Sequence, residues 1–260
     1  MIDRGGGVLS ALRRRYRQAQ IGARLRRDSE RGLRDGVRVV HMLHVRKTGG
    51  TAVKAALEGA DVPVGMRLLL HGHGISLRDV PANDDIFLFL RDPVARFLSG
   101  FDMRRREGRP RHYRPWTTAE RRVFERYGSA QDLALALGSS TRSARTEAER
   151  AMRNVAHLRS HLGDWLGDER QVHERQDSLI FIGWQEQLDS DFAALVALLG
   201  IPPETHLPSD AYAANRADDD ATQKPLSADA IEIIRSWYAE DYRLIDLLVG
   251  LGLTHPPSAE

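Results

Sequence analysis

The chain has 260 residues, of which 42% are hydrophobic and 28% are charged, and its formal net charge at pH 7 is +2. This balance is typical of a soluble globular protein and excludes a disordered or fibrous chain. No apolar run approaches the roughly 20 residues of a membrane span, no signal sequence is recognisable, and the absence of cysteine excludes disulfides and thiolate metal sites. We therefore expect a cytoplasmic protein.

The first 36 residues form a basic segment. They contain ten arginines against four acidic residues, so the segment carries +6 and the remaining 224 residues sum to −4. Scattered apolar residues predict a basic amphipathic helix, with a flexible extension as the alternative. These apolar positions are Leu12, Tyr16, Leu25 and Leu33. Such a segment suits peripheral contact with an anionic membrane, nucleic acid or an acidic polymer. We expect residues 37–260 to form a single domain.

Beyond residue 36, short β-rich runs alternate with longer helical patterns, which is typical of an α/β domain with a mainly parallel sheet. Strands are predicted at residues 37–45, 65–74, 84–92 and 178–184. The third of these, "DDIFLFLRD", is a near-continuous apolar run, as expected of a strand buried on both faces. Helices are predicted at residues 51–59, 93–106, 117–128, 141–167, 187–200 and 227–249.

The turn after the first predicted strand reads "RKTGGT". Its residues are Arg46, Lys47, Thr48, Gly49, Gly50 and Thr51. A glycine-containing turn that joins a strand to a helix directs backbone N–H groups at one point near the positive end of the helix dipole, where a phosphate-like anion binds. The threonines add hydroxyl donors and the lysine adds a charge. The lysine precedes the glycines, unlike in a Walker A loop, which argues against ATP or GTP. The alternative is a tight turn with an exposed lysine.

A second candidate anion site follows the strand at residues 84–92. Arg91 leaves the end of this strand, and Ser99 lies within the helix that Pro93 opens. An arginine at this position can clamp a phosphate in a fork geometry, and the serine can donate to the same group. Two anion sites imply a ligand with two separated anionic groups. Alternatively, Arg91 pairs with a neighbouring aspartate, Asp92 or Asp85, and Ser99 only packs.

The segment "HGHG" follows the second predicted strand and contains His71 and His73. A neutral histidine is a suitable general base for removing a proton from a hydroxyl group. Two histidines at this spacing are also compatible with structural roles or with metal binding, although no third ligand of obvious spacing is present. We therefore expect no metal.

These motifs, in this order, resemble those of the sulfotransferase family, in particular its Golgi-type carbohydrate branch that includes heparan sulfate 2-O-sulfotransferase. The similarity spans roughly residues 38–248, although only the first two motifs are specific. It implies a P-loop-NTPase-like three-layer α/β/α fold with additional helices. It also implies that residues 46–52, through Ala52, bind the 5′-phosphosulfate of 3′-phosphoadenosine 5′-phosphosulfate (PAPS), and that Arg91 and Ser99 bind its 3′-phosphate. This chain has Arg46 where the family commonly has proline.

The resemblance also implies catalytic roles. His73 corresponds to the histidine regarded as the base, with His71 as its neighbour, and Lys47 is expected to stabilise the bridging oxygen as adenosine 3′,5′-bisphosphate leaves. The late loop contributes Arg216 as a further phosphate contact. An arginine-rich stretch after the cofactor helix suits an acidic oligosaccharide as acceptor, with Arg104, Arg105 and Arg106 as its predicted contacts.

Two other functions remain possible from the sequence. A nucleotide-dependent kinase-like enzyme shares the sheet and the anion-binding turn, but it requires a lysine after the glycines followed by a Mg²⁺-binding serine or threonine. A non-catalytic polyanion-binding module explains the arginine-rich segments, but it does not explain the turn at 46–51 together with Arg91 and Ser99. We do not expect sequence-specific binding of nucleic acid.

Overall fold

The structure is a computed structural model that describes residues 5–110, 112–210 and 225–257. Within this part of the chain, one parallel sheet has the strand order β2-β1-β3-β4. The strands are β1 (Arg38–Leu43), β2 (Met66–Leu70), β3 (Asp85–Leu90) and β4 (Leu179–Trp184). All four predicted strands are present, and five of the six residues of β3 are buried, as its apolar run predicts. The predicted α/β class with a parallel sheet is confirmed.

Helices cover both faces of this sheet. Helices α2 (Gly50–Glu58) and α9 (Leu188–Leu199) pack on one face, where Val53 and Phe192 join the core with Phe87 of β3. The other face is covered by α7 (Gly163–Leu166), α8 (Glu169–Arg175) and α11 (Ala239–Gly250). Trp165 and Leu248 belong to the core on this side. The predicted three-layer α/β/α arrangement is therefore present. Two short 3₁₀ helices, η1 (Gln176–Ser178) and η2 (Gln185–Gln187), flank β4.

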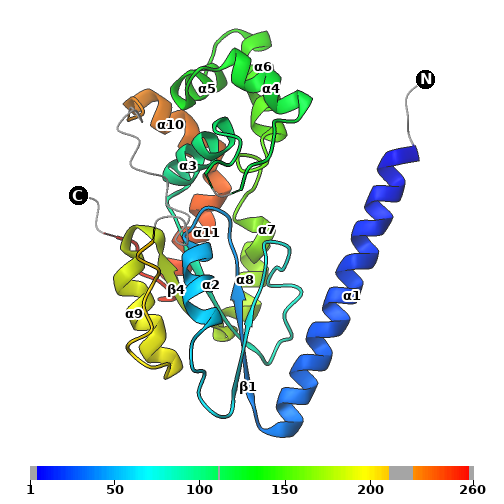
Figure 1. The fold of residues 1–260 in the computed structure, drawn as a ribbon. Helices are drawn as coiled ribbons and strands as arrows, with labels where there is room; N and C mark the ends of the chain where they lie inside the picture. Colours follow the sequence, from blue (N-terminus) through cyan, green and yellow to red (C-terminus); the bar gives the residue numbers. More distant parts are fainter. Residues whose placement is uncertain (1–4, 111, 211–224, 258–260) are drawn as a thin grey trace.

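Five further helices form a helical lobe beside the sheet (Figure 1). They are α3 (Pro93–Arg105), α4 (Thr118–Arg126), α5 (Ala130–Leu137), α6 (Arg142–Asn154) and α10 (Ala228–Trp237). Their buried side chains, among them Phe101, Leu133 and Met152, form a core of their own. Helix α3 starts directly after β3, so it joins the sheet to the lobe.

The basic N-terminal segment is a long helix, α1 (Gly5–Asp35), whose N-terminal end stands away from the rest of the molecule (Figure 1). Leu25 is only 4% exposed and belongs to the core beside the sheet. Tyr16 and Leu33 are 67% and 74% exposed, so these two apolar residues do not join that core. The side chain of Leu12 lies outside the described residues. No helix among the described residues is long and apolar enough to span a bilayer.

Two predicted helices are interrupted in the structure. The helix predicted at 141–167 ends at Asn154, because Val155 adopts an extended conformation and is buried in the helical lobe. The helix predicted at 227–249 breaks at Tyr238, whose hydroxyl group donates to the backbone oxygen of Leu158 at 2.6 Å. Helices α5 and α8 were not predicted, although capping boxes start both of them.

Candidate active site

The predicted site residues meet at the carboxyl edge of the sheet. The turn at residues 44–49 follows β1, Arg91 follows β3, and His71 follows β2. The strand order places β2 on one side of β1 and β3 on the other, so the chain reverses its direction of winding between β1 and β3. In open parallel sheets, ligands bind in the crevice at this point. The two predicted anion sites therefore lie next to each other.

The turn at residues 46–50 has a tightly constrained backbone. Lys47 and Gly49 both have positive φ values, 66° and 77°, and Gly49 precedes the first residue of α2. A Cβ atom on Gly49 would lie 2.8 Å from the side chain of Leu188, and one on Gly50 would lie 2.5 Å from the ring of His44. Packing against these side chains thus favours glycine at both positions. The first N–H groups of α2 have no intrahelical acceptor, which leaves them available to an anion.

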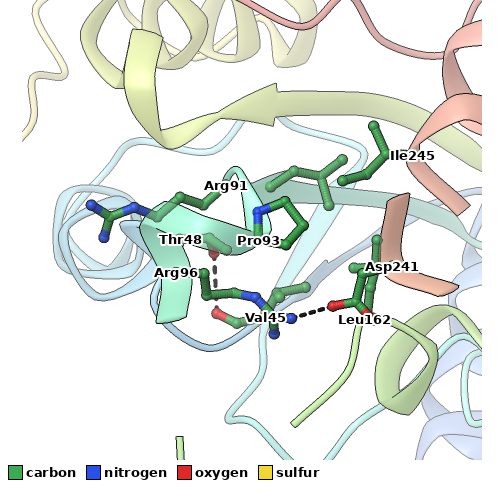
Figure 2. A pocket seen from close by; sticks show the side chains of 9 residues that line it. Val45, Thr48, Arg91, Pro93, Arg96, Leu162, Asp241 and Ile245 are labelled. Atoms are coloured by element: carbon green, nitrogen blue, oxygen red, sulfur yellow. Dashed lines mark hydrogen bonds and ion pairs between the residues drawn. The ribbon is translucent and has the colours of Figure 1, made fainter. Parts of the chain in front are cut away.

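Two predicted donors of this turn are used within the protein. The hydroxyl of Thr48 is buried and donates to the backbone oxygen of Val45 at 3.1 Å (Figure 2). A hydroxyl has a single hydrogen, so the predicted donation from this side chain to an anion is not supported. The amide of Ala52 donates to the backbone oxygen of Gly49 at 2.9 Å. The donors that remain for an anion are the amides at the start of α2 and the half-buried Thr51.

Lys47, Arg91 and Arg106 bring positive charges together at the turn. Burial, and then the charges of Arg91 and Arg106, lowers the pKa of Lys47 from 10.5 to about 8, while Asp102 opposes this shift. The Nε atoms of Arg91 and Arg106 are buried and have no hydrogen-bond partner among the described residues. Such a group of cations is a suitable environment for an anionic ligand. An anion offsets the repulsion between the positive charges and accepts hydrogen bonds from the buried donors that have no partner.

Among the described residues, Arg91 makes no direct ion pair with Asp92 or Asp85, although the charges of Glu186 and Asp92 raise its pKa against the larger effect of burial. Asp85 pairs with Arg38 at 2.5 Å. Asp92 accepts a hydrogen bond from the amide of Ala95 at the start of α3 and another from the hydroxyl of Tyr242. The Nη1 atom of Arg91 instead lies 3.5 Å from the backbone oxygen of Lys47, which places this side chain beside the turn.

A small internal cavity of about 10 Å³ lies behind the turn (Figure 2). It has room for about one water molecule and is too small for a nucleotide. Arg96 lines it, is buried, and forms an ion pair with Asp241 of α11. Arg96 thereby fixes α3 against the sheet layer. Arg91 also lines this cavity, but in Figure 2 its guanidinium extends away from the Arg96–Asp241 pair, so the two arginines of the "RDPVAR" segment make different contacts.

His73 has the geometry of a general base. Its Nδ1 atom lies 2.8 Å from the backbone oxygen of His44, so Nδ1 carries the hydrogen and Nε2 is left with a free lone pair. The indole of Trp165 donates to the backbone oxygen of His73 at 3.2 Å and holds the loop. Burial lowers the pKa of His73, and the charges of Arg46, Lys54 and Lys47 lower it further, while the hydrogen bond to His44 opposes them. His73 is therefore neutral at pH 7.

His71 contacts a different histidine. Its Nε2 atom lies 2.8 Å from Nδ1 of the buried His41, and burial lowers its pKa to about 4. His71 and His73 are thus both neutral, but they are held through different ring nitrogens. Among the described residues, no group of three or more histidine, aspartate or glutamate side chains has a geometry that could hold a metal ion.

The structure adds His157 and Arg159 to the site, neither of which was predicted. The charges of Lys47, Arg46 and His73 contribute to lowering the pKa of His157 to about 3, after burial as the largest cause. The Nδ1 atom of His157 is buried and has no hydrogen-bond partner among the described residues. Burial and then the charge of Arg159 lower the pKa of Arg46. Both residues follow the end of α6, so only the unexpected end of that helix brings them here.

The arginines predicted to bind the acceptor differ in their surroundings. Arg104 is 3% exposed and donates to both carboxylate oxygens of Glu120, at 2.8 and 2.9 Å. This buried pair holds the loop after α3, so the predicted substrate contact is not supported for Arg104. Arg105 and Arg106 line an open cleft of about 390 Å³ together with Trp116.

Two other predicted contacts remain without a defined partner. Ser99 is half-buried on α3, and its hydroxyl makes no hydrogen bond among the described residues. Arg216 lies outside the described residues.

Of the comparisons with known proteins, one found a match. No curated protein and no solved structure shows significant similarity to the chain. A model of the sulfotransferase family, however, matches residues 77–246, which is more than half of the chain. The match includes β3, Arg91 and α3, and it begins after the turn at 46–51 and the two histidines. The fold is accordingly the P-loop-NTPase-like fold of these enzymes. The chain belongs to the sulfotransferase family.

Proposed function

We propose that this sulfotransferase uses PAPS as its donor and sulfates a hydroxyl group of an acidic carbohydrate, as in the branch that includes heparan sulfate 2-O-sulfotransferase. The observation that carries the donor assignment is the group of Lys47, Arg91 and Arg106 at the carboxyl edge of the sheet, with buried Nε donors that have no partner in the described part of the chain. A donor with two separated anionic groups matches this arrangement.

PAPS supplies an activated sulfuryl group and a bisphosphate leaving group. The amides at the start of α2 and Thr51 bind the 5′ end of the donor, where the helix dipole favours negative charge. Arg91, which follows β3, binds the 3′-phosphate with Ser99 of α3. Lys47, whose backbone oxygen lies 3.5 Å from Nη1 of Arg91, stabilises the charge that develops on the bridging oxygen.

His73 removes the proton from the acceptor hydroxyl in this proposal. Its Nε2 lone pair is free because Nδ1 donates to the backbone oxygen of His44. Burial, and then the charges of Arg46, Lys54 and Lys47, lowers the pKa of His73 and keeps the ring neutral at pH 7, so it is ready to accept a proton. Positioning of the acceptor hydroxyl and stabilisation of charge then account for the rate, as in phosphoryl transfer.

The open cleft beside Arg106 is the proposed acceptor site. Arg105, Arg106 and Arg109 line it, and they suit carboxylate or sulfate groups on a sugar chain. Tyr113 is exposed and lies under the guanidinium of Arg109, at 4.2 Å from the ring centroid. Trp116 also lines the cleft, and aromatic rings provide flat surfaces against which sugar rings pack.

Isothermal titration calorimetry tests the donor. Adenosine 3′,5′-bisphosphate is expected to bind the wild-type protein more tightly than ATP with Mg²⁺, and Lys47→Ala and Arg91→Ala are expected to weaken it. Arg170→Ala is the matched control, because Arg170 is exposed on α8 and pairs with a neighbouring glutamate, Glu174. Tighter binding of ATP would favour a kinase-like enzyme, and binding of neither nucleotide would favour a polyanion-binding module.

Transfer of radiolabelled sulfate from PAPS tests the acceptor. Acidic and partly sulfated oligosaccharides are expected to be labelled faster than neutral ones. Arg105→Ala is expected to raise the KM of the acidic acceptors without changing the affinity for the bisphosphate. Equal rates with neutral and acidic sugars would contradict the proposed acceptor class.

A further inference from the structure

A continuous chain of buried and half-buried polar groups leads from the N-terminal helix to His71. Ser29 of α1 donates to Oδ1 of Asp84 at 2.7 Å. The other oxygen of Asp84 lies 2.9 Å from Nε2 of His41, and Nδ1 of His41 lies 2.8 Å from Nε2 of His71. His41 is completely buried on β1, and Asp84, which directly precedes β3, is nearly so.

The order of these contacts determines which nitrogen atoms carry hydrogen. The Asp84 carboxylate can only accept hydrogen bonds, so Nε2 of His41 must be the donor. Burial lowers the pKa of His41 more than Asp84 raises it, so this ring is neutral and its Nδ1 is an acceptor. Nε2 of His71 must then carry a hydrogen, which leaves Nδ1 of His71 with a free lone pair.

We propose that Asp84 and His41 are positioning residues that fix His71 in this tautomer and thereby hold the loop that carries His73, the proton acceptor. This inference rests on the proposed function, since it assigns a further role in the same transfer. His41 holds the ring of His71 and the backbone oxygen of His44 holds the ring of His73, so β1 positions this loop through both histidines.

Several elements hold this chain of groups in place. Arg175 of α8 donates to the backbone oxygens of Leu77, Val80 and Pro81, in the loop that leads to Asp84. Helix α1 contributes Ser29, and its Gln18 also contacts the backbone oxygen of Gly74, at 3.4 Å. The positive charges near the two rings are Arg175, Arg24 and Lys54, and the negative charges besides Asp84 are Asp28 and Asp79.

A purely structural role does not account well for this arrangement. Burying a carboxylate and an imidazole costs free energy that an apolar pair of similar volume would not cost. The chain of groups also ends at a half-buried histidine in the loop that carries His73, and not within the core. The same loop is joined to β1 again by the hydrogen bond between His73 and His44.

Nitrogen-15 NMR of the histidine rings tests the tautomer in the full chain without donor or acceptor. We expect His71 to be a single neutral tautomer with hydrogen on Nε2, and Asp84→Ala to remove this preference. Asp85→Ala is the matched control, because Asp85 is adjacent in sequence but pairs with Arg38 at the surface. Hydrogen on Nδ1 of His71, or a mixture of tautomers in the wild type, would overturn the proposal whatever the donor is.

Kinetics test the role in transfer. Asp84→Asn is expected to lower kcat on the order of ten- to a hundredfold, with the acceptor KM and the bisphosphate affinity within about twofold of wild type. A loss no larger than that of Asp85→Asn would refute the positioning role. If Asp84→Asn does not fold, Ser29→Ala removes only the outer hydrogen bond and is expected to lower kcat by a smaller factor. Failure of the wild type to bind the bisphosphate would instead refute the donor assignment.

Discussion

Replacing Lys47 by methionine is expected to stabilise the fold at neutral pH while it abolishes donor binding. Burial, and then Arg91 and Arg106, lowers the pKa of Lys47 from 10.5 to about 8. A lysine with a lower pKa in the folded than in the unfolded chain destabilises the fold wherever it is protonated. A pKa of about 8 in place of 10.5 corresponds to at most about 3 kcal/mol of destabilisation at pH 7 and to about 2 kcal/mol at pH 9, where the folded form is already largely neutral.

Methionine isolates the effect of the charge. It keeps an unbranched apolar side chain, and it is subject to the same backbone strain at a φ of 66° as lysine. The free energy of unfolding is measured by urea denaturation at pH 7 and pH 9 for wild type and Lys47→Met. Lys54→Met controls for the loss of a lysine, because Lys54 lies on α2 and pairs with Glu58 at 3.6 Å.

The pH dependence decides this prediction. The difference between variant and wild type should shrink by about 1 kcal/mol from pH 7 to pH 9, since the wild type loses its unfavourable proton over that range. A variant less stable than wild type at pH 7, or a difference independent of pH, would show that Lys47 is not held in a crowded cationic site.

Three other substitutions have defined outcomes. Arg104→Ala should lower the free energy of unfolding by about 3–5 kcal/mol, because it leaves the Glu120 carboxylate buried without its partner. Urea denaturation measures this free energy, and a loss below about 1 kcal/mol would contradict the prediction. Gly50→Ala should cost about 1–3 kcal/mol, because its methyl group would lie 2.5 Å from the His44 ring; an unchanged denaturation midpoint would show that the turn can relax. His73→Ala should lower turnover on the order of 10²- to 10⁴-fold with unchanged bisphosphate affinity by calorimetry; an equal loss of affinity would place this histidine in donor binding.

The sequence predicts an element of the fold well when its pattern of apolar residues matches the burial of those residues in the folded protein. The apolar run at 84–92 leads to a strand buried on both faces, and the break in periodicity at Pro93 starts α3. The turn after β1 was recognisable because only glycine tolerates some of its positions. The structure shows a second reason for these glycines, since Gly49 and Gly50 lie against Leu188 and His44.

The helix predicted at 141–167 shows where local pattern fails. No glycine or proline lies between residues 142 and 162, so the sequence gives no reason for a break. The break arises because Val155 and Leu158 are buried in the helical lobe, which outweighs helix propensity. As a result, His157 lies near Lys47 and not on a helix surface.

The sequence by itself determined the parallel sheet, the turn at 46–51 and the position of Arg91, because strand periodicity and glycine-dependent turns are local properties of the chain. Only the tertiary structure decided which polar groups remain available for chemistry. Arg104 and Thr48 matched their predicted roles by residue type, yet their hydrogen bonds are used within the protein. The tautomer of His71 depends on Asp84 through His41. Such contacts join residues that are distant in sequence, and their hydrogen-bond partners are fixed only when the layers of the fold pack together.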